Sequence, residues 1–183
     1  MTSAAARAKQ AVRAFDAAVD RRVDRLRGNP VADRVMYAAS ELGDWSLIWH
    51  VIGAGQALLP GRDPMSAVRL SAILGAESII VNGGVKSLFR RTRPTWHLET
   101  DRPHKLRTPR SSSFPSGHAS SAFTAAGVLS QGDPLWPLYY GIAAVVASSR
   151  AYVKIHHASD VVAGAALGVA MGALARRVWP LDS

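Results

Sequence analysis

The fold is decided by a stretch near the C-terminus, VVAGAALGVAMGALA (residues 161–175), which contains no Asp, Glu, Lys or Arg. Glycine recurs in it at every fourth residue, at Gly164, Gly168 and Gly172. Such a stripe of small residues lets two helix backbones approach closely, and packing of this kind holds helices together inside a bilayer. We expect a helix over residues 159–178 that packs closely on a neighbour, with an ordinary Ala- and Gly-rich helix as the alternative.

Four more apolar runs precede this stretch. Residues 45–61, 111–132 and 134–149 carry no formal charge, and residues 68–89 are interrupted only by Arg69, Glu77 and Lys86. A hydrocarbon core of ~30 Å needs roughly 20 helical residues, so two of the five runs are long enough by themselves. The others need flanking arginines that reach the interface. Five such runs in 183 residues leave little chain for polar helices around them, which argues against a soluble bundle.

We therefore predict an all-α, polytopic membrane bundle of about five spans. Turn signals place its helices at 1–27, 31–42, 45–59, 66–89, 115–132, 135–149 and 159–178. We expect Glu77, which is costly in lipid, to face the interior of the bundle. A proline-containing basic loop over residues 90–114 is expected either to contact a substrate headgroup or to serve as the positive flank of a span.

The N-terminal segment predicts a separate amphipathic helix. Its apolar residues recur at intervals of three and four along one face: Val12, Phe15, Val19, Val23 and Leu26. We expect this helix to lie on the membrane surface, with packing on a protein core as the alternative. The chain then divides into an interfacial helix, residues 1–30, and a membrane-embedded domain, residues 31–183. No apolar segment follows the first basic residues, so we expect no signal peptide.

Charge and cysteine content narrow the classes of function. The formal net charge of +9 suits either nucleic acid or an anionic membrane surface. No recognition motif for nucleic acid accompanies it, so we expect membrane lipids and not nucleic acid as partners. The chain has no cysteine, which excludes disulfides, thiolate metal sites and cysteine nucleophiles.

Histidines and cations are concentrated in three segments: residues 86–94 (KSLFRRTRP), 113–118 (SFPSGH) and 149–160 (SRAYVKIHHASD). If successive spans alternate in direction, all three segments meet at one face of the membrane. There they bring together Lys86, Arg93 and Arg150 with two histidines and one carboxylate. Such a set suits a tetrahedral oxyanion such as phosphate.

The remaining residues of these segments suggest separate roles around that anion. The backbone amides of Ser116 and Gly117, at a helix N-terminus, add hydrogen-bond donors. Asp160 follows His156 by four residues, about one helical turn, and could fix its tautomer. His118 is then free to protonate a leaving oxygen.

The three segments resemble the signature of the type 2 phosphatidic acid phosphatase superfamily, which includes lipid phosphate phosphatases, bacterial acid phosphatases and vanadium haloperoxidases. The matching positions are Lys86-x6-Arg93-Pro94, Pro115-Ser116-Gly117-His118 and Ser149-Arg150-x5-His156-x3-Asp160. The resemblance implies that His156 is the nucleophile that forms a phosphohistidine, that Asp160 orients it and that His118 is the general acid. It also implies that the phosphoryl oxygens are held, without metal or other cofactor, by Lys86, Arg93, Ser116, Gly117 and Arg150. We expect the neighbouring His157 to point elsewhere, the swapped assignment being the alternative.

The resemblance implies an integral membrane phosphatase of a lipid or polyprenyl phosphate. Expected substrates are phosphatidic acid, phosphatidylglycerol phosphate, or a polyprenyl phosphate, diphosphate or phosphosugar of cell-envelope synthesis. A soluble or peripheral acid phosphatase, a vanadate-dependent peroxidase and a non-enzymatic membrane scaffold are the alternatives. We expect the plasma (inner) membrane of a bacterium. On the expected topology 18 of the 22 Lys and Arg residues lie on the active-site face, which the positive-inside rule places in the cytoplasm.

Overall fold

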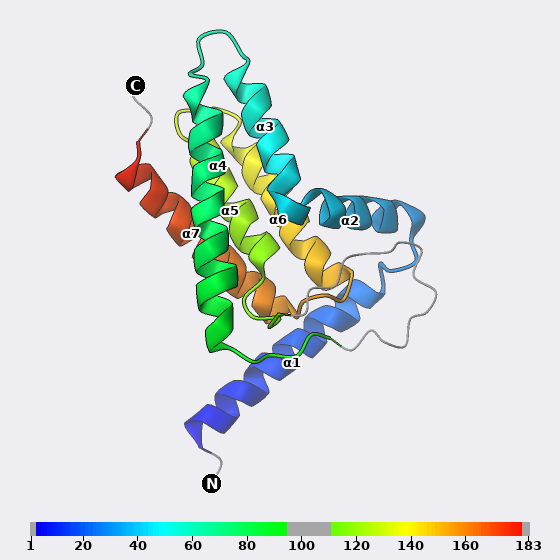
Figure 1. Ribbon diagram of the computed structural model, residues 1–183. Helices are drawn as coiled ribbons and strands as arrows, with labels where there is room; N and C mark the ends of the chain where they lie inside the picture. The colour runs from blue at the N-terminus through cyan, green and yellow to red at the C-terminus, as the bar shows by residue number, and fades with distance from the viewer. Residues whose placement is uncertain (1–2, 95–110, 181–183) are drawn as a thin grey trace.

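The computed structural model describes residues 3–94 and 111–180, and within these ranges every regular element is helical (Figure 1). The seven α-helices are α1 (Ala4–Asp24), α2 (Pro30–Leu42), α3 (Leu47–Ala57), α4 (Met65–Ser78), α5 (Gly117–Leu129), α6 (Trp136–Tyr152) and α7 (Ala158–Val178). A 3-10 turn, Asp44–Ser46, precedes α3. A π-helical segment, Ile79–Gly84, and a 3-10 turn, Val85–Leu88, continue α4. The predicted all-α class is confirmed.

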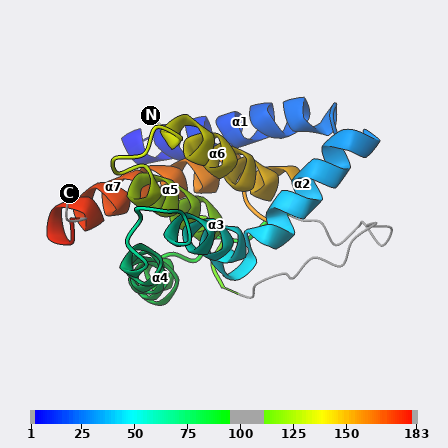
Figure 2. The ribbon, with the colours of Figure 1, turned by 90° about the horizontal axis from the view of Figure 1, so that it is seen from above.

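Helix α5 forms the centre of the bundle, and ten of its 13 residues are buried. Helices α6 and α7 pack against it most extensively, and α4 packs on it from another side. The bundle is crossed at one end by α1, which lies on the side away from α4 (Figures 1 and 2). The N-terminus of α5, the C-terminus of α6 and the N-terminus of α7 all lie at this end (Figure 1).

The close packing predicted from the glycine stripe is confirmed, and the neighbour is α5. A Cβ atom at Gly164 would lie 2.4 Å from the Ser116 carbonyl oxygen, and one at Gly168 would lie 2.3 Å from that of Ser120. The Thr124 hydroxyl donates to the Gly168 carbonyl across this interface at 3.2 Å. Only glycine at these positions allows α7 to lie so near the backbone of α5, and this contact fixes the N-terminus of α5 beside that of α7.

Two of the described helical segments are long and apolar enough to cross a bilayer. They are Met65–Leu88, with 24 residues and a mean hydropathy of 1.3, and Ala158–Val178, with 21 residues and a mean hydropathy of 1.6. The other three expected spans correspond to α3, α5 and α6, which have 11, 13 and 17 residues. Helix α5 can be this short because it is surrounded by protein.

Helix α1 meets the protein through only part of its apolar stripe, since Val23 packs against Tyr152, Val153 and Ile155. Val12, Phe15 and Leu26 are exposed, and the buried residue of the helix is Asp16. An acid removed from water needs a cation or several hydrogen-bond donors. Its partners lie in the site described next.

Candidate active site

The three segments that carry the histidines and cations converge at the end of the bundle where α1 crosses. The Ser116 amide donates to the Asp160 carbonyl at 3.0 Å, which ties the start of α5 to the first turn of α7. A Cβ at Gly117 would lie 3.4 Å from Lys86 Nζ, so the end of the α4 extension reaches the same point. The chain after Lys86 brings Arg93 to His156, between α6 and α7. The geometry thus collects residues that are up to 74 positions apart in the sequence.

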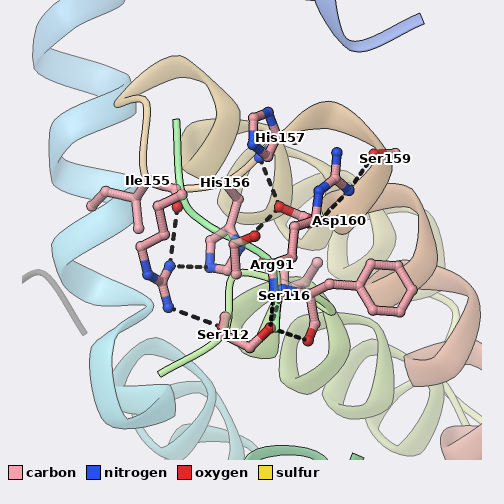
Figure 3. Close-up of polar contacts among 12 residues, drawn as sticks. Arg91, Ser112, Ser116, Ile155, His156, His157, Ser159 and Asp160 are labelled. Atoms are coloured by element: carbon pink, nitrogen blue, oxygen red, sulfur yellow. Dashed lines mark hydrogen bonds and ion pairs between the residues drawn. The ribbon is translucent and has the colours of Figure 1, made fainter. Parts of the chain in front are cut away.

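His156 lies in the turn between α6 and α7 and is 3% exposed. Its backbone N–H donates to the Arg150 carbonyl at 3.0 Å, which holds the turn on the end of α6. Its Nε2 lies 3.1 Å from Arg93 Nη1, and its Nδ1 lies 3.7 Å from Asp160 Oδ2 (Figure 3). Since a guanidinium group can only donate, Nε2 carries the lone pair and the ring proton sits on Nδ1, facing the carboxylate. The ring is therefore in the tautomer of a nucleophile, although 3.7 Å is longer than a hydrogen bond.

Burial lowers the pKa of His156 to about 3, because an imidazolium is poorly solvated inside the protein. The carboxylate of Asp160 opposes this effect, and the positive charges of Arg93 and Arg150 add to it. Burial likewise lowers the pKa of the Arg93 guanidinium. The His156 ring is consequently neutral near pH 7, as attack on an electrophile requires.

Asp160 is fully buried and held by several donors. Its Oδ2 accepts the backbone N–H of His157 at 2.9 Å, and its Oδ1 accepts Arg91 Nη1 at 2.6 Å. Helix α7 is therefore capped by His157 and begins at Ala158, one residue before the start that Ser159 and Asp160 suggested. The carboxylate is locked in a single orientation between His156 and Arg91.

His118, the second residue of α5, faces an acid that the sequence did not single out. Its Nε2 lies 2.9 Å from Asp44 Oδ1 in the turn before α3. A Cβ at Gly43 would lie 2.7 Å from His118 Cδ2, so this approach depends on a glycine. The Asp44 carboxylate lies close enough to fix the orientation of the His118 ring.

The predicted phosphate ligands are present but differ in how free their donors are. Lys86 Nζ donates to Asn82 Oδ1 at 2.7 Å. Arg93 donates to the carbonyls of Ile155, Ser111 and Ser112 at 3.0–3.3 Å. Arg150 is 1% exposed and donates from Nη1 to Ser40 Oγ, while its buried Nε has no hydrogen-bond partner among the described residues. A buried guanidinium N–H without an acceptor fits an anion that arrives from outside.

The prediction for the backbone amide of Ser116 was wrong. That N–H is used by the Asp160 carbonyl and is not available to a phosphoryl oxygen. The Ser116 hydroxyl caps α5 by accepting from Ala119, which leaves its own proton for another acceptor. Gly117 is closely surrounded, since a Cβ there would lie 2.8 Å from Asn82 Oδ1. The start of α5 can therefore contribute the hydroxyl of Ser116 and the amide of Gly117.

His157 does not share the position of His156. Its Nε2 contacts the Thr92 carbonyl at 3.2 Å, and its ring lies on the other side of the Asp160 carboxylate in Figure 3. No group of three or more His, Asp or Glu residues that could hold a metal ion occurs in the described ranges. Trp96, His97, His104, Lys105 and Arg107 of the basic loop lie outside the described residues.

A cavity of about 980 Å³ opens beside His156, between α1 and the segments at 89–94 and 151–158. Its walls carry several apolar side chains: Val12, Val19, Val23, Phe89 and Phe114. They also carry the cations Lys9, Arg13, Arg90 and Lys154. Asp16 and Asp20 also line the cavity, and of the predicted site residues only His156 does. The cavity is therefore a space beside the nucleophile, outside the ring of predicted phosphate ligands.

Three residues around the predicted set were missed by the sequence reasoning: Asp16, Asp44 and Arg91. Asp44 follows Gly43 at a turn, which signals a bend but not a contact with His118. Arg91 lies among other arginines in the loop. Asp16 is one of several acids on a basic helix and carries no motif. Their positions depend on contacts between distant elements, which spacing along the chain does not encode.

The chain is similar in sequence to known proteins. A family profile for the PAP2 superfamily matches residues 66–182. The chain is 33% identical over 139 residues to the decaprenylphosphoryl-5-phosphoribose phosphatase of Mycobacterium tuberculosis, covering 74% of this chain and 73% of that protein. It is 36% identical over 101 residues to the undecaprenyl-diphosphatase of Sulfolobus acidocaldarius, covering 54% of this chain and 45% of that protein.

Two crystal structures share the fold. The transmembrane PAP2-type phosphatidylglycerolphosphate phosphatase from Bacillus subtilis superposes with a TM-score of 0.69 at 26% identity, covering 92% of this chain and 86% of that one. Aquifex aeolicus LpxE also gives a TM-score of 0.69, at 24% identity, covering 87% of this chain and 93% of that one.

Proposed function

Because the chain belongs to the PAP2 superfamily, a family of phosphoric ester hydrolases, we propose that it is a membrane phosphatase that cleaves the terminal phosphate of a polyprenyl-phosphosugar. The observation that carries this proposal is the environment of His156. Its unprotonated Nε2 faces Arg93 and lies beside a cavity whose walls are both apolar and cationic.

The reaction proceeds in two displacements on phosphorus. His156 Nε2 attacks, the bond to the leaving oxygen breaks, and His118 transfers its proton to that oxygen. Asp160, facing Nδ1, stabilises the positive charge that the ring acquires. A water molecule, deprotonated by His118, then attacks the phosphohistidine, and the phosphorus–nitrogen bond breaks to release inorganic phosphate.

The phosphoryl oxygens are held by Lys86, Arg93 and Arg150, assisted by the Ser116 hydroxyl and the Gly117 amide. These cations offset the charge that develops in the transition state, in a site that largely excludes water.

The lining of the cavity supports this class of substrate. A polyprenyl-phosphosugar phosphate carries a phosphodiester near the lipid chain in addition to the monoester that is cleaved. Lys9, Arg13 and Arg90 line the cavity next to His156 and suit this second anion, while its apolar wall suits the first prenyl units. The 33%-identical Mycobacterium tuberculosis relative acts, by its name, on a lipid of this kind.

We further propose five spans, with α1 on the membrane surface and the active site in the cytoplasm. Phe15 is exposed on α1 and can enter the interface, while Asp16 faces the protein. Because the chain has no cysteine, single cysteines at Thr2 and Ser183 can be labelled on intact cells with an impermeant reagent. Labelling at Ser183 alone supports this orientation, and labelling at Thr2 alone contradicts it.

The central test is phosphate release in detergent with EDTA from four lipids: decaprenylphosphoryl-5-phosphoribose, undecaprenyl diphosphate, phosphatidylglycerol phosphate and phosphatidic acid. We expect the highest kcat/KM for the phosphosugar, and a higher value for undecaprenyl diphosphate would overturn the substrate class. Substrate labelled in the phosphate should leave an acid-labile phosphoenzyme in wild type and none in His156→Ala. His157→Ala, the matched control, should form it normally.

A further inference from the structure

Asp16 connects the N-terminal helix to the catalytic groups. It is 9% exposed, and it precedes the region matched by the family profile, which begins at residue 66. Its Oδ1 accepts the backbone N–H of Ser159 at 2.8 Å, and its Oδ2 accepts the Ser159 hydroxyl at 3.0 Å. The same Oδ2 pairs with Arg91 Nη2 at 2.6 Å. A carboxylate of α1 is thus built into the first turn of α7.

Arg91 stands between two carboxylates. While its Nη2 binds Asp16, its Nη1 binds Asp160 Oδ1 at 2.6 Å and the Ser159 hydroxyl at 2.8 Å (Figure 3). The other oxygen of Asp160, Oδ2, accepts the backbone N–H of His157 and faces His156 Nδ1. The chain of contacts therefore runs from α1 through one guanidinium to the carboxylate that supports the nucleophile.

Charge balance shows what Asp16 contributes. Without it, the full positive charge of Arg91 would pair with Asp160, drawing that carboxylate away from His156 and weakening its support of the ring. Because Asp16 shares the guanidinium, Asp160 keeps negative charge for the imidazolium-like ring that forms during attack. The phosphate-holding residues Lys86 and Arg150 take no part in these contacts.

The docking of α1 is fixed at a second point. Arg27, just after α1, donates to the carbonyls of Tyr152 and Ala151 at 2.8 and 3.0 Å, at the end of α6. Its side chain also pairs with Asp20 on α1 at 2.8 Å. The helix is therefore held on both elements that flank His156, and Asp16 is presented to Arg91 in a defined position.

We propose that Asp16 and Arg91 are positioning residues for phosphate transfer, Asp16 holding Arg91 so that Arg91 orients Asp160 toward His156. This rests on the proposed phosphatase reaction and on the role of His156 in it. It makes the N-terminal helix a working part of the active site.

The test compares Asp16→Asn and Arg91→Gln with wild type, using p-nitrophenyl phosphate, whose hydrolysis depends on the phosphate chemistry and not on the lipid. Each variant should lower kcat by roughly 10- to 100-fold, as expected for a misplaced catalytic group, with KM changed by less than about twofold. Arg22→Gln is the control, because Arg22 is exposed on the same helix, and its substitution removes one positive charge as Arg91→Gln does. It should keep the wild-type kcat.

The double variant Asp16→Asn/Arg91→Gln separates positioning from general support of the fold. If Asp16 acts through Arg91, it should lose no more activity than Arg91→Gln alone, whereas independent effects would multiply. Multiplying losses, an unchanged kcat, or equal losses in Arg22→Gln would overturn the proposal. If Asp16→Asn does not give a monodisperse protein, the test rests on Arg91→Gln, which leaves α1 unchanged. An unchanged kcat in that variant would overturn the proposal. A wrong lipid assignment would appear only in the four-lipid comparison.

Discussion

Replacing Gly164 with alanine should lower kcat because the added Cβ pushes the backbones of α5 and α7 apart. The added Cβ would lie 2.4 Å from the Ser116 carbonyl oxygen and 3.1 Å from Ala119 Cβ. A carbon and an oxygen need about 3.2 Å, so the helices must separate by roughly 0.8 Å at this point. The backbone oxygen cannot rotate away, because the Ser116 carbonyl accepts from Ser120 at 3.1 Å in the first turn of α5.

Separating the two helices would also displace the proposed catalytic residues. The Ser116 amide is bonded to the Asp160 carbonyl, so separating α5 from α7 moves Ser116, Gly117 and His118 away from Asp160 and His156. A misplacement of about 1 Å can cost roughly 100-fold in rate. Overpacking costs about 1–3 kcal/mol, partly offset by the ~1 kcal/mol that alanine gains over glycine in a helix. We expect a net loss of stability of about 0–2 kcal/mol.

Two control variants separate activity from stability. Gly168→Ala creates an equal clash, 2.3 Å from the Ser120 carbonyl oxygen, but one turn farther from the site. It should lower the Tm as much and kcat less. Gly141→Ala on α6 meets nothing within 4 Å and should raise the Tm slightly. The measurements are kcat on p-nitrophenyl phosphate and thermal unfolding in detergent, and a Gly164→Ala variant with kcat within twofold of wild type would refute the reasoning.

Three other outcomes follow from the site. Because the pKa of His156 is lowered to about 3, the unfolded chain takes up a proton below its ordinary value near 6.5 that the folded chain does not. Stability should therefore fall as the pH drops from 6.5 toward 4.5, by roughly 1.4 kcal/mol per unit at most, and the Tm of His156→Gln should fall less over this range. Asp44→Asn should slow hydrolysis of an alkyl phosphate by roughly 100-fold and of p-nitrophenyl phosphate much less, because only the poor leaving group needs a proton from His118; equal losses on both substrates would argue against this role. His157→Ala should keep most of the turnover in EDTA that His156→Ala abolishes, and equal losses in the two variants would contradict the assignment of the nucleophile.

The sequence was sufficient for the fold class and for the convergence of the three segments that carry the histidines and cations. His156 and Asp160 lie four residues apart at the start of α7, and a pairing over one helical turn is visible in the chain. The glycine stripe of α7 was equally visible, because helix–helix contact repeats every fourth residue. The number of spans was harder to predict, since α5 shows that an apolar run can be buried by protein as well as by lipid.

The groups that hold those residues in place could not be predicted. Asp44 and Arg91 each act on a side chain more than 60 positions away, and the apolar pattern of α1 concealed the buried acid of the helix. Hydrophobic periodicity shows which face of a helix avoids water, but it does not show which polar residue meets a cation. The amide of Ser116 failed as a prediction for the same reason, because its acceptor belongs to another helix.

The position of α1 ties substrate selection to the rate of reaction. The helix places Asp16 against Arg91, and on the same side it presents Lys9 and Arg13 to the cavity. A change that moves the helix to accommodate another headgroup therefore also moves the carboxylate that orients Asp160 through Arg91. Headgroup preference can change without loss of kcat through the cationic side chains that line the cavity, Lys9, Arg13 and Arg90, with the helix left in place. We therefore expect substitutions of the α1 side chains that line the cavity to lower kcat far less than changes that shift the whole helix.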